Sequence, residues 1–176
     1  MRVVSGTARG RALNAPLPKS VRPTTDRVKE SIFDMLGSLG GVQGLQVLDL
    51  FCGSGALGIE ALSRGAAHVT FVDADRLALE AARANLNAVG LGDESASFVR
   101  GTLPGWTPPH VDLVLADPPY DMENVSSILE LLKADLVVLE SRNEPLVPEG
   151  WVLHRQRRYG TTLVTVLRSD NAGESL

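Results

Sequence analysis

The 176-residue sequence predicts an α/β protein with one mostly parallel sheet covered by helices on both faces. From residue 45 onward, short apolar runs alternate with segments whose apolar residues recur at helical spacing. A glycine-rich turn joins the first of these runs to the first of these helices. The composition, with 44% hydrophobic and 22% charged residues, is typical of a single domain that buries a core.

The segment before residue 45 predicts a hairpin, a linker and a helix. Residues 2–5 and 11–14 flank a glycine-containing turn, which predicts a small hairpin. Prolines at positions 16, 18 and 23 predict an extended linker. Thr25 is expected to cap a helix that begins at Asp26. The apolar face of this helix consists of Val28, Ile32, Phe33 and Leu36.

The remaining elements alternate between strand and helix and end with a hairpin. The expected strands are Leu45–Phe51, Val69–Val72, Ala96–Val99, Val111–Ala116 and Leu136–Glu140. The expected helices are Ala56–Ser63, Arg76–Val89 and Val125–Lys133, the second with Leu77, Ala81, Ala84 and Ala88 on one side. Trp151–Gln156 and Thr161–Arg168 predict an antiparallel hairpin at the edge of the sheet, followed by a frayed tail.

The net charge of −4 conceals an uneven distribution of charge along the chain. Residues 1–29 carry +6 and residues 151–168 carry +4, whereas residues 30–150 carry −12. Basic segments at both ends of an acidic body favour a surface that binds a polyanion, because the local potential matters more than the total charge. A basic tail that only improves solubility is the alternative.

The composition argues against a membrane-spanning, secreted or metal-binding protein. No apolar run is long enough to span a bilayer, and the N-terminus has neither the apolar stretch nor the cleavage site of a signal peptide. The single cysteine, Cys52, cannot form an internal disulfide, and the three histidines lack metal-ligand spacing. We therefore expect a cytoplasmic protein without a metal, and a monomer because no exposed apolar stripe stands out.

A glycine-rich loop is the first chemical signal. Gly53, Gly55 and Gly58 form a G-x-G-x-x-G pattern that follows a strand and opens a helix. Asp73 ends the next strand, where its carboxylate can accept hydrogen bonds from both hydroxyls of a ribose, at about 1.5–3 kcal/mol each. Asp49 precedes the loop and suits a cationic ligand such as S-adenosylmethionine better than a pyrophosphate. Asp49 could instead, or also, cap the loop.

The second signal is Asp117-Pro118-Pro119-Tyr120, at the end of a later strand. The prolines stiffen the turn and leave the carbonyl of Pro118 free to face a ligand. If Asp117 and this carbonyl accept the two hydrogens of an exocyclic amine, the nitrogen lone pair is localised for attack on a methyl group. Tyr120 offers a face for an extruded base, worth about 1–3 kcal/mol of stacking.

These motifs resemble those of class I S-adenosylmethionine-dependent amino-methyltransferases. Together with Arg9–Arg11, Arg22–Phe33 and Gly55–Ala66, they are similar to the bacterial RsmD family, the 16S rRNA (guanine 966-N2)-methyltransferases. The resemblance runs from about residue 3 to residue 168. It implies a seven-stranded Rossmann-like methyltransferase fold and a guanine N2 target in 16S ribosomal RNA. It also implies action on a small ribosomal subunit that is still assembling.

The resemblance also implies a set of site residues. The catalytic group would be Asp117, Pro118, Pro119 and Tyr120. The S-adenosylmethionine site would comprise Asp49, Phe51, Gly53, Ser54, Gly55, Asp73, Ala74 and Thr102, the last being the polar residue where related enzymes contact the adenine amine. The charge distribution, rather than the resemblance, predicts a basic RNA-binding extension at residues 1–24 with Arg9, Arg11, Lys19 and Arg22. It precedes a catalytic domain at 25–168 and a tail at 169–176.

Other functions can be tested against the same residues. A C5-pyrimidine methyltransferase needs a nucleophilic cysteine near the target base, and Cys52 lies inside the cofactor loop instead. A DNA adenine-N6 methyltransferase shares the Asp-Pro-Pro-Tyr motif but usually carries a separate target-recognition region. A non-catalytic RNA-binding module on the same fold is a further alternative, whereas the residues of a nicotinamide dehydrogenase are missing. Glu140 either reaches the crevice or caps a loop.

Overall fold

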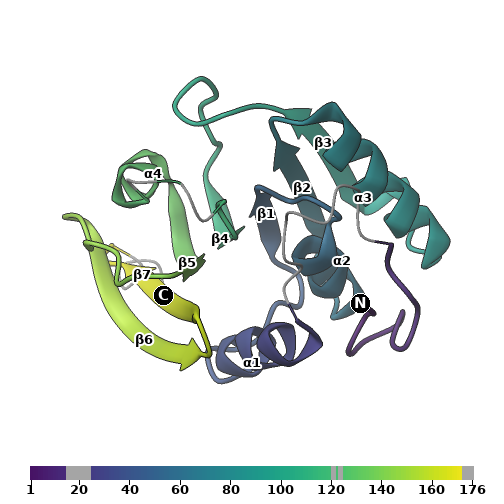
Figure 1. Ribbon diagram of the computed structural model, residues 1–176, viewed down its shortest axis with the longest axis horizontal. Helices are drawn as coiled ribbons and strands as arrows, with labels where there is room; N and C mark the ends of the chain where they lie inside the picture. The colour runs from purple at the N-terminus through teal and green to yellow at the C-terminus, as the bar shows by residue number, and fades with distance from the viewer. Residues whose placement is uncertain (15–24, 120–121, 123–124, 172–176) are drawn as a thin grey trace.

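The computed structural model contains a seven-stranded mixed sheet with helices on both faces (Figure 1). It describes residues 1–14, 25–119, 122 and 125–171. The strands are β1 (Gln46–Leu50), β2 (His68–Asp73), β3 (Ala96–Arg100), β4 (Val111–Ala116), β5 (Ala134–Ser141), β6 (Trp151–Tyr159) and β7 (Thr162–Ser169). They lie in the order β3-β2-β1-β4-β5-β7-β6. The first five are parallel, and β7 pairs antiparallel with both β5 and β6, so the predicted fold class is confirmed.

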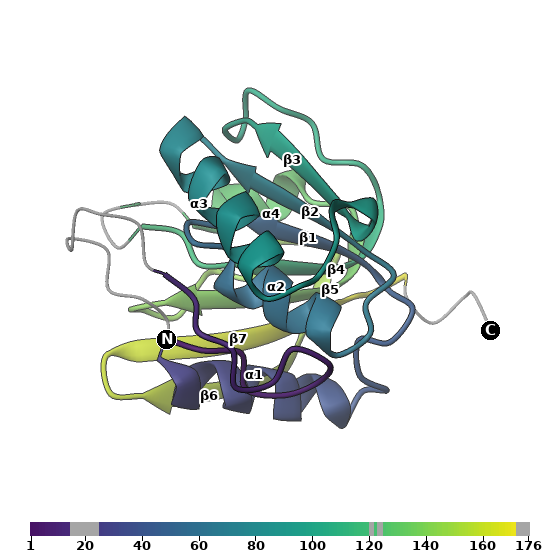
Figure 2. The same cartoon turned by 90° about the vertical axis from the view of Figure 1, so that its right-hand side faces the viewer.

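The helices form two layers, one on each face of the sheet (Figure 2). The helices are α1 (Asp26–Gly37), α2 (Ala56–Ser63), α3 (Arg76–Ala88) and α4 (Ser126–Leu131), with a short 3-10 turn at Asp93–Ser95. Alternate residues of β1 pack against the two helical layers. Val47 packs in the core with α1, α2 and α3, whereas Leu48 and Leu50 pack with α4. No helix in the described ranges is long and apolar enough to cross a membrane.

The predicted start of α1 is confirmed. The side chain of Thr25 accepts a hydrogen bond from the backbone N–H of Val28, at 3.3 Å. This bond satisfies one of the amides that the first turn of a helix leaves without a partner.

The side of α3 singled out from the sequence is not the side that packs. Leu77 is 57% exposed, whereas the buried residues are Ala78, Leu79, Ala82, Asn85 and Leu86. Alanines occur all round this helix, so apolar spacing alone does not distinguish its faces. The polar Asn85 lies in the buried stripe because its amide nitrogen donates to the carbonyls of Asn14 and Ser54.

The first fourteen residues form the expected hairpin and dock on the helical layer. Arg2 and Ala12 make an isolated antiparallel bridge, and Val3, Ala8 and Leu13 are buried. Ser63, the last residue of α2, receives this hairpin: its side-chain oxygen accepts from the N–H of Ala8 at 2.9 Å. The hairpin is therefore part of the folded body.

A buried ion pair also anchors the N-terminal segment. Lys29 of α1 and Glu60 of α2 have fully buried side chains, 3.4 Å apart. The carboxylate of Glu60 also accepts from the backbone N–H groups of Val4 and Ser5, at 2.8 and 2.9 Å. Burial lowers the pKa of Lys29, and the charge of Glu60 opposes that effect. Lys29, one of the basic residues counted in the N-terminal segment, therefore does not face solvent.

Candidate active site

The candidate site lies where the parallel strands end. In a parallel sheet the carboxyl ends of the strands meet at one edge, and ligands bind in the crevice outside that edge. Asp73 ends β2, Asp117 directly follows β4, and Glu140 is the penultimate residue of β5. Leu50 of β1 pairs with Val72 and with Ala116, so the loop after β1 begins between the ends of β2 and β4.

The glycine-rich loop makes a tight turn from β1 into α2. Phe51, Gly53 and Gly55 all have positive φ angles, of 58°, 52° and 76°. Gly58 lets α2 approach β2 closely, because a Cβ there would lie 2.4 Å from the ring of Phe71. Asn85 holds the loop from α3 by donating to the carbonyl of Ser54 at 2.9 Å. The sequence analysis did not predict this role of Asn85. The only signal was a polar residue among the alanines of a predicted helix.

Asp49 lies beneath this loop with only 2% of its surface exposed. Its carboxylate accepts a hydrogen bond from the N–H of Gly58 at 2.9 Å, which is the loop-capping contact considered from the sequence. Burial raises the pKa of Asp49 well above its ordinary value, the Gly58 bond opposes this, and the charges of Asp117 and Asp73 raise it further. An ionised Asp49 would therefore be stabilised by a cation in the crevice.

Asp73 joins two loops at the carboxyl edge. One carboxylate oxygen accepts from the N–H of Gly53 at 3.0 Å, and the other accepts from the N–H of Asp75 at 2.9 Å. Each oxygen keeps acceptor capacity, since a carboxylate has about four acceptor positions. Asp73 can therefore hold the glycine-rich loop and still accept from a ligand.

Ala74 and Thr102 flank Asp73 at the surface. Both are exposed, and the side chain of Arg100 donates to the carbonyl of Ala74 at 3.1 Å. The N–H of Gly101 donates to the carbonyl of Asp73 at 3.1 Å, which brings the segment after β3 beside the end of β2. Asp73, Ala74 and Thr102 thus lie together at the carboxyl edge of the sheet.

Asp117, Pro118 and Pro119 continue from β4 at the same edge. Asp117 is half-buried, Pro118 is buried and Pro119 is exposed. A pocket of about 200 Å³ adjoins them, with Pro118, Pro119, Met122, Ser126, Glu140 and Asn143 among its lining residues. Tyr120, the fourth residue of the predicted catalytic group, lies outside the described residues.

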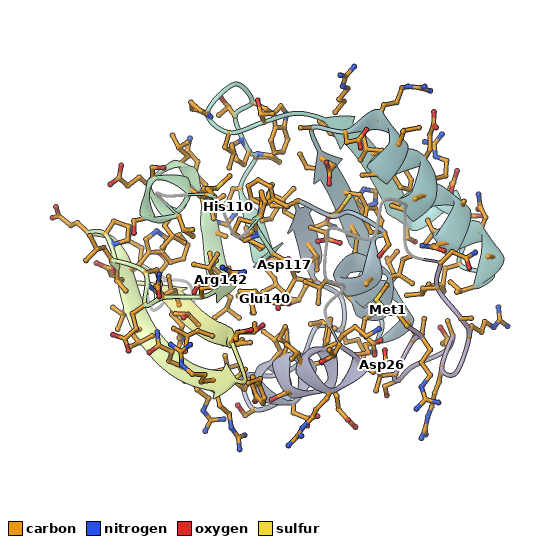
Figure 3. All side chains as sticks on the ribbon, in the orientation of Figure 1. Met1, Asp26, His110, Asp117, Glu140 and Arg142 are labelled. Carbon is orange, nitrogen blue, oxygen red and sulfur yellow. The ribbon has the colours of Figure 1, made fainter. Side chains whose placement is uncertain are left out.

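Glu140 is the neighbour of Asp117 on the adjacent strand. The two residues follow the last paired position of β4 and β5, Ala116 with Leu139. The residues two positions earlier on each strand, Leu115 and Val138, pack in the same core layer, so both carboxylates face the same side of the sheet. Glu140 is only 3% exposed and lines the pocket. Figure 3 labels Glu140 next to Asp117. Of the two alternatives that the sequence left open, the position of Glu140 favours the crevice.

Cys52 is unsuited to nucleophilic chemistry. It is buried in the loop, and burial raises the pKa of its thiol, with the charges of Asp49 and Asp73 acting in the same direction. The thiolate is the reactive form of cysteine. This agrees with the exclusion of a covalent C5-pyrimidine mechanism.

The predicted RNA-binding residues lie apart from this site as far as the structure describes them. Arg9 is exposed, and the guanidinium of Arg11 donates to the carbonyl of Val89 at the end of α3. The turn of their hairpin contacts Ser63 at the end of α2. This end of α2 lies close to the amino ends of the parallel strands, because the carbonyl of Gly65 accepts from the N–H of Gly44, just before β1. Lys19 and Arg22 lie outside the described residues.

Residues 1–168 match a protein family described as Conserved hypothetical protein 95. The chain belongs to this family. It is 36% identical to Ribosomal RNA small subunit methyltransferase D of Escherichia coli strain K12, covering 99% of this chain and 93% of that protein. It is 32% identical to the protein of the same name from Haemophilus influenzae, over 91% of this chain and 89% of that protein.

Solved structures support the same family fold. The Escherichia coli protein yhhF is similar with a TM-score of 0.82 and 34% identity, covering 96% of this chain and 97% of that chain. A hypothetical protein from Thermus thermophilus has a TM-score of 0.78 and 30% identity, covering 94% of this chain and 98% of that chain. The predicted resemblance to this methyltransferase family is thereby confirmed.

Proposed function

We propose that this protein transfers a methyl group from S-adenosylmethionine to the exocyclic N2 amine of a guanine in 16S ribosomal RNA. One observation carries the proposal. The register of Leu50 with Ala116 brings the glycine-rich loop and Asp117-Pro118-Pro119 to the ends of adjacent strands. A methyl donor held by the loop would then lie beside an amine held by Asp117. The names of the Escherichia coli and Haemophilus influenzae relatives support a ribosomal RNA substrate.

The residues around the loop suit S-adenosylmethionine, which carries positive charge and no phosphate. Asp49 is a buried carboxylate whose ionised form needs a nearby cation, and Asp73 has acceptor capacity for ribose hydroxyls. Phe51, Gly53, Ser54, Gly55, Ala74 and Thr102 would complete the cofactor site. When bound, S-adenosylmethionine supplies an electrophilic methyl group attached to sulfur.

Asp117 would activate the amine and take up its proton. With one N–H bonded to Asp117 and the other to the carbonyl of Pro118, the nitrogen lone pair is directed at the methyl carbon. As the N–C bond forms and the S–C bond breaks, the electron pair of the S–C bond stays on sulfur. The nitrogen becomes acidic, and Asp117 accepts its proton before passing it to solvent. Tyr120 and Pro119 would hold the base in place.

The carboxylate of Glu140 favours guanine over adenine at this position. In guanine the ring nitrogen next to the amine carries a hydrogen, so this edge presents donors to both Asp117 and Glu140. In adenine the corresponding ring nitrogen is an acceptor and would face the carboxylate of Glu140 without a hydrogen. A mismatch of this kind leaves a buried acceptor unpaired, which costs about 1–3 kcal/mol. This contrast is the reason to prefer a guanine-N2 enzyme to an adenine-N6 enzyme.

The basic extension at residues 1–24 would contact the RNA through Arg9, Arg11, Lys19 and Arg22, ahead of the catalytic domain at 25–168 and the tail at 169–176. We infer a cytoplasmic monomer that acts on the small subunit or its assembly intermediate. Deleting residues 1–20 would be a poor test of the extension, because it would remove partners of the buried Glu60. Replacing the exposed Arg9 with Ala is the better variant.

The experiment is a mass-spectrometric map of modified nucleotides in ribosomal RNA from a strain that lacks the protein. One 16S guanine should lose its N2 methyl group, and the wild-type gene, but not an Asp117→Ala gene, should restore it. Loss of an N6-methyladenine instead would favour the adenine enzyme. No lost modification, together with intact RNA binding in vitro, would favour a non-catalytic RNA-binding module.

A further inference from the structure

The edge strand β6 ends at the same side of the sheet as the candidate site. It pairs antiparallel with β7, which itself pairs antiparallel with β5, so β6 and β5 run in the same direction. Arg157 pairs with Val164, which in turn pairs with Glu140. Arg157 therefore lies level with Glu140, two strand spacings or about 10 Å away across the sheet. The sequence alone could not give this register.

Three arginines on this strand, Arg155, Arg157 and Arg158, form what we term the β6 strip. All three are exposed, and residues 151–168 contain no acidic side chain. Among the described residues, no salt bridge involves any of the three. By contrast, the exposed Arg76 and Arg83 on α3 pair with Glu80 and Asp93. The strip is therefore a concentration of cationic charge that the fold itself does not neutralise.

The strip is built on a rigid support. Arg158 donates to the carbonyl of Arg142, just after β5, at 3.0 Å. The guanidinium of Arg157 lies 5.8 Å from the ring centre of Tyr159, whose hydroxyl bonds to the side chain of Ser31 in α1. Guanidinium groups fixed on a strand lose less conformational freedom on binding than groups on a loop.

The arrangement favours a strand-like polyanion over a flat one. Arg155 and Arg157 pair with Val166 and Val164, whose side chains pack in the α1 layer. Arg158 is next in the chain, so its side chain points to the opposite face. A flat anionic membrane would meet cations from one face, whereas a nucleic-acid backbone that crosses the open edge of β6 can meet both.

We propose that the β6 strip binds backbone phosphates of the RNA strand that leads into the pocket at Pro118 and Pro119. This rests on the proposed function, because it takes RNA as the substrate. The strip would hold the strand two strand spacings from β5 while Asp117 and Glu140 engage the extruded base. It adds a phosphate-binding surface at the catalytic edge, separate from the turn of the N-terminal hairpin, which contacts Ser63 at the other edge.

The test compares Arg157→Ala/Arg158→Ala with the control Arg83→Ala in the full-length protein. Affinity for in-vitro transcribed 16S ribosomal RNA is measured by fluorescence anisotropy at several salt concentrations. Removing one arginine–phosphate interaction should reduce the slope of log affinity against log salt by about 0.7 for single-stranded RNA, so the double variant should show a reduction of about 1.4. Its affinity at fixed salt should fall by about tenfold or more per arginine. The control should match the wild type.

Two further measurements separate this surface from the proposed function. S-adenosylmethionine affinity of the double variant should equal that of the wild type, and the KM for RNA should rise with little change in kcat. If the wild type methylates 16S ribosomal RNA but the double variant keeps its RNA affinity and salt slope, the β6 strip is wrong and the function stands. The proposal would also be overturned if the double variant lost binding to phosphatidylglycerol vesicles that the wild type shows, while its RNA affinity stayed equal to that of the wild type. If the wild type methylates neither the 16S ribosomal RNA nor the small ribosomal subunit, the proposed function itself fails.

Discussion

Replacing Asp73 with Ala should weaken S-adenosylmethionine binding and also destabilise the protein. The carboxylate makes two backbone hydrogen bonds, to Gly53 at 3.0 Å and to Asp75 at 2.9 Å. At about 0.5–1.5 kcal/mol net for each bond, the free energy of unfolding should fall by about 1–3 kcal/mol. The two expected ribose bonds are charge-assisted, and water replaces them in part. Their loss should cost about 2–3 kcal/mol of binding, or about 30- to 150-fold in Kd.

Asp75→Ala is the matched control, since it removes the same charge two residues further along. Asp75 caps α3 by accepting from the N–H of Leu77 at 2.9 Å, so its loss should cost about 1 kcal/mol of stability. Isothermal titration gives the two Kd values, and urea denaturation gives the two stabilities. Equal losses of cofactor affinity in both variants would refute the ribose contact, because loop stability would then explain the effect. An unchanged Kd in Asp73→Ala would remove this residue from the site.

Three further predictions concern catalysis, pH and folding. Asp117→Ala should slow methylation by about 100-fold or more, measured as a single-turnover rate, with the cofactor Kd nearly unchanged. Tyr120→Ala should lose the stacking on the base and so weaken RNA affinity, whereas Tyr120→Phe should keep both. The raised pKa of Asp49 favours its protonated form in the folded protein, so its stabilising contribution is complete below its ordinary pKa of 3.8 and is lost as pH rises through the raised value. Cofactor affinity should rise over the same pH range and become flat in Asp49→Asn, as titration calorimetry at several pH values would reveal. Glu60→Gln should lower the free energy of unfolding by about 3–5 kcal/mol by leaving Lys29 buried without its partner, and adding Lys29→Met should recover most of that loss in urea denaturation.

Much of the architecture could be predicted because it depends on short-range patterns. The alternation of apolar runs and helical spacing depends on neighbouring residues, and it placed every strand of the sheet within a few positions of the observed one. The cap at Thr25 and the glycine-rich turn at Gly53 are likewise local. The prediction of which side of α3 is buried was wrong because a helix rich in alanine has no single apolar face. The hydrogen-bond partners of Asn85 also lie far away in the chain.

The chemical groups of the candidate site could be recognised from the amino-acid sequence, since Asp49, Asp73 and Asp117 each lie at or next to the carboxyl end of a recognisable strand. Which of these strand ends are neighbours depends on the tertiary structure. Glu140 lies beside Asp117 because β5 pairs with β4, and Arg157 lies level with Glu140 because β7 pairs with both β5 and β6. That order reflects long-range pairing and the packing of two helical layers. Apolar spacing within one strand carries no information about the strand beside it.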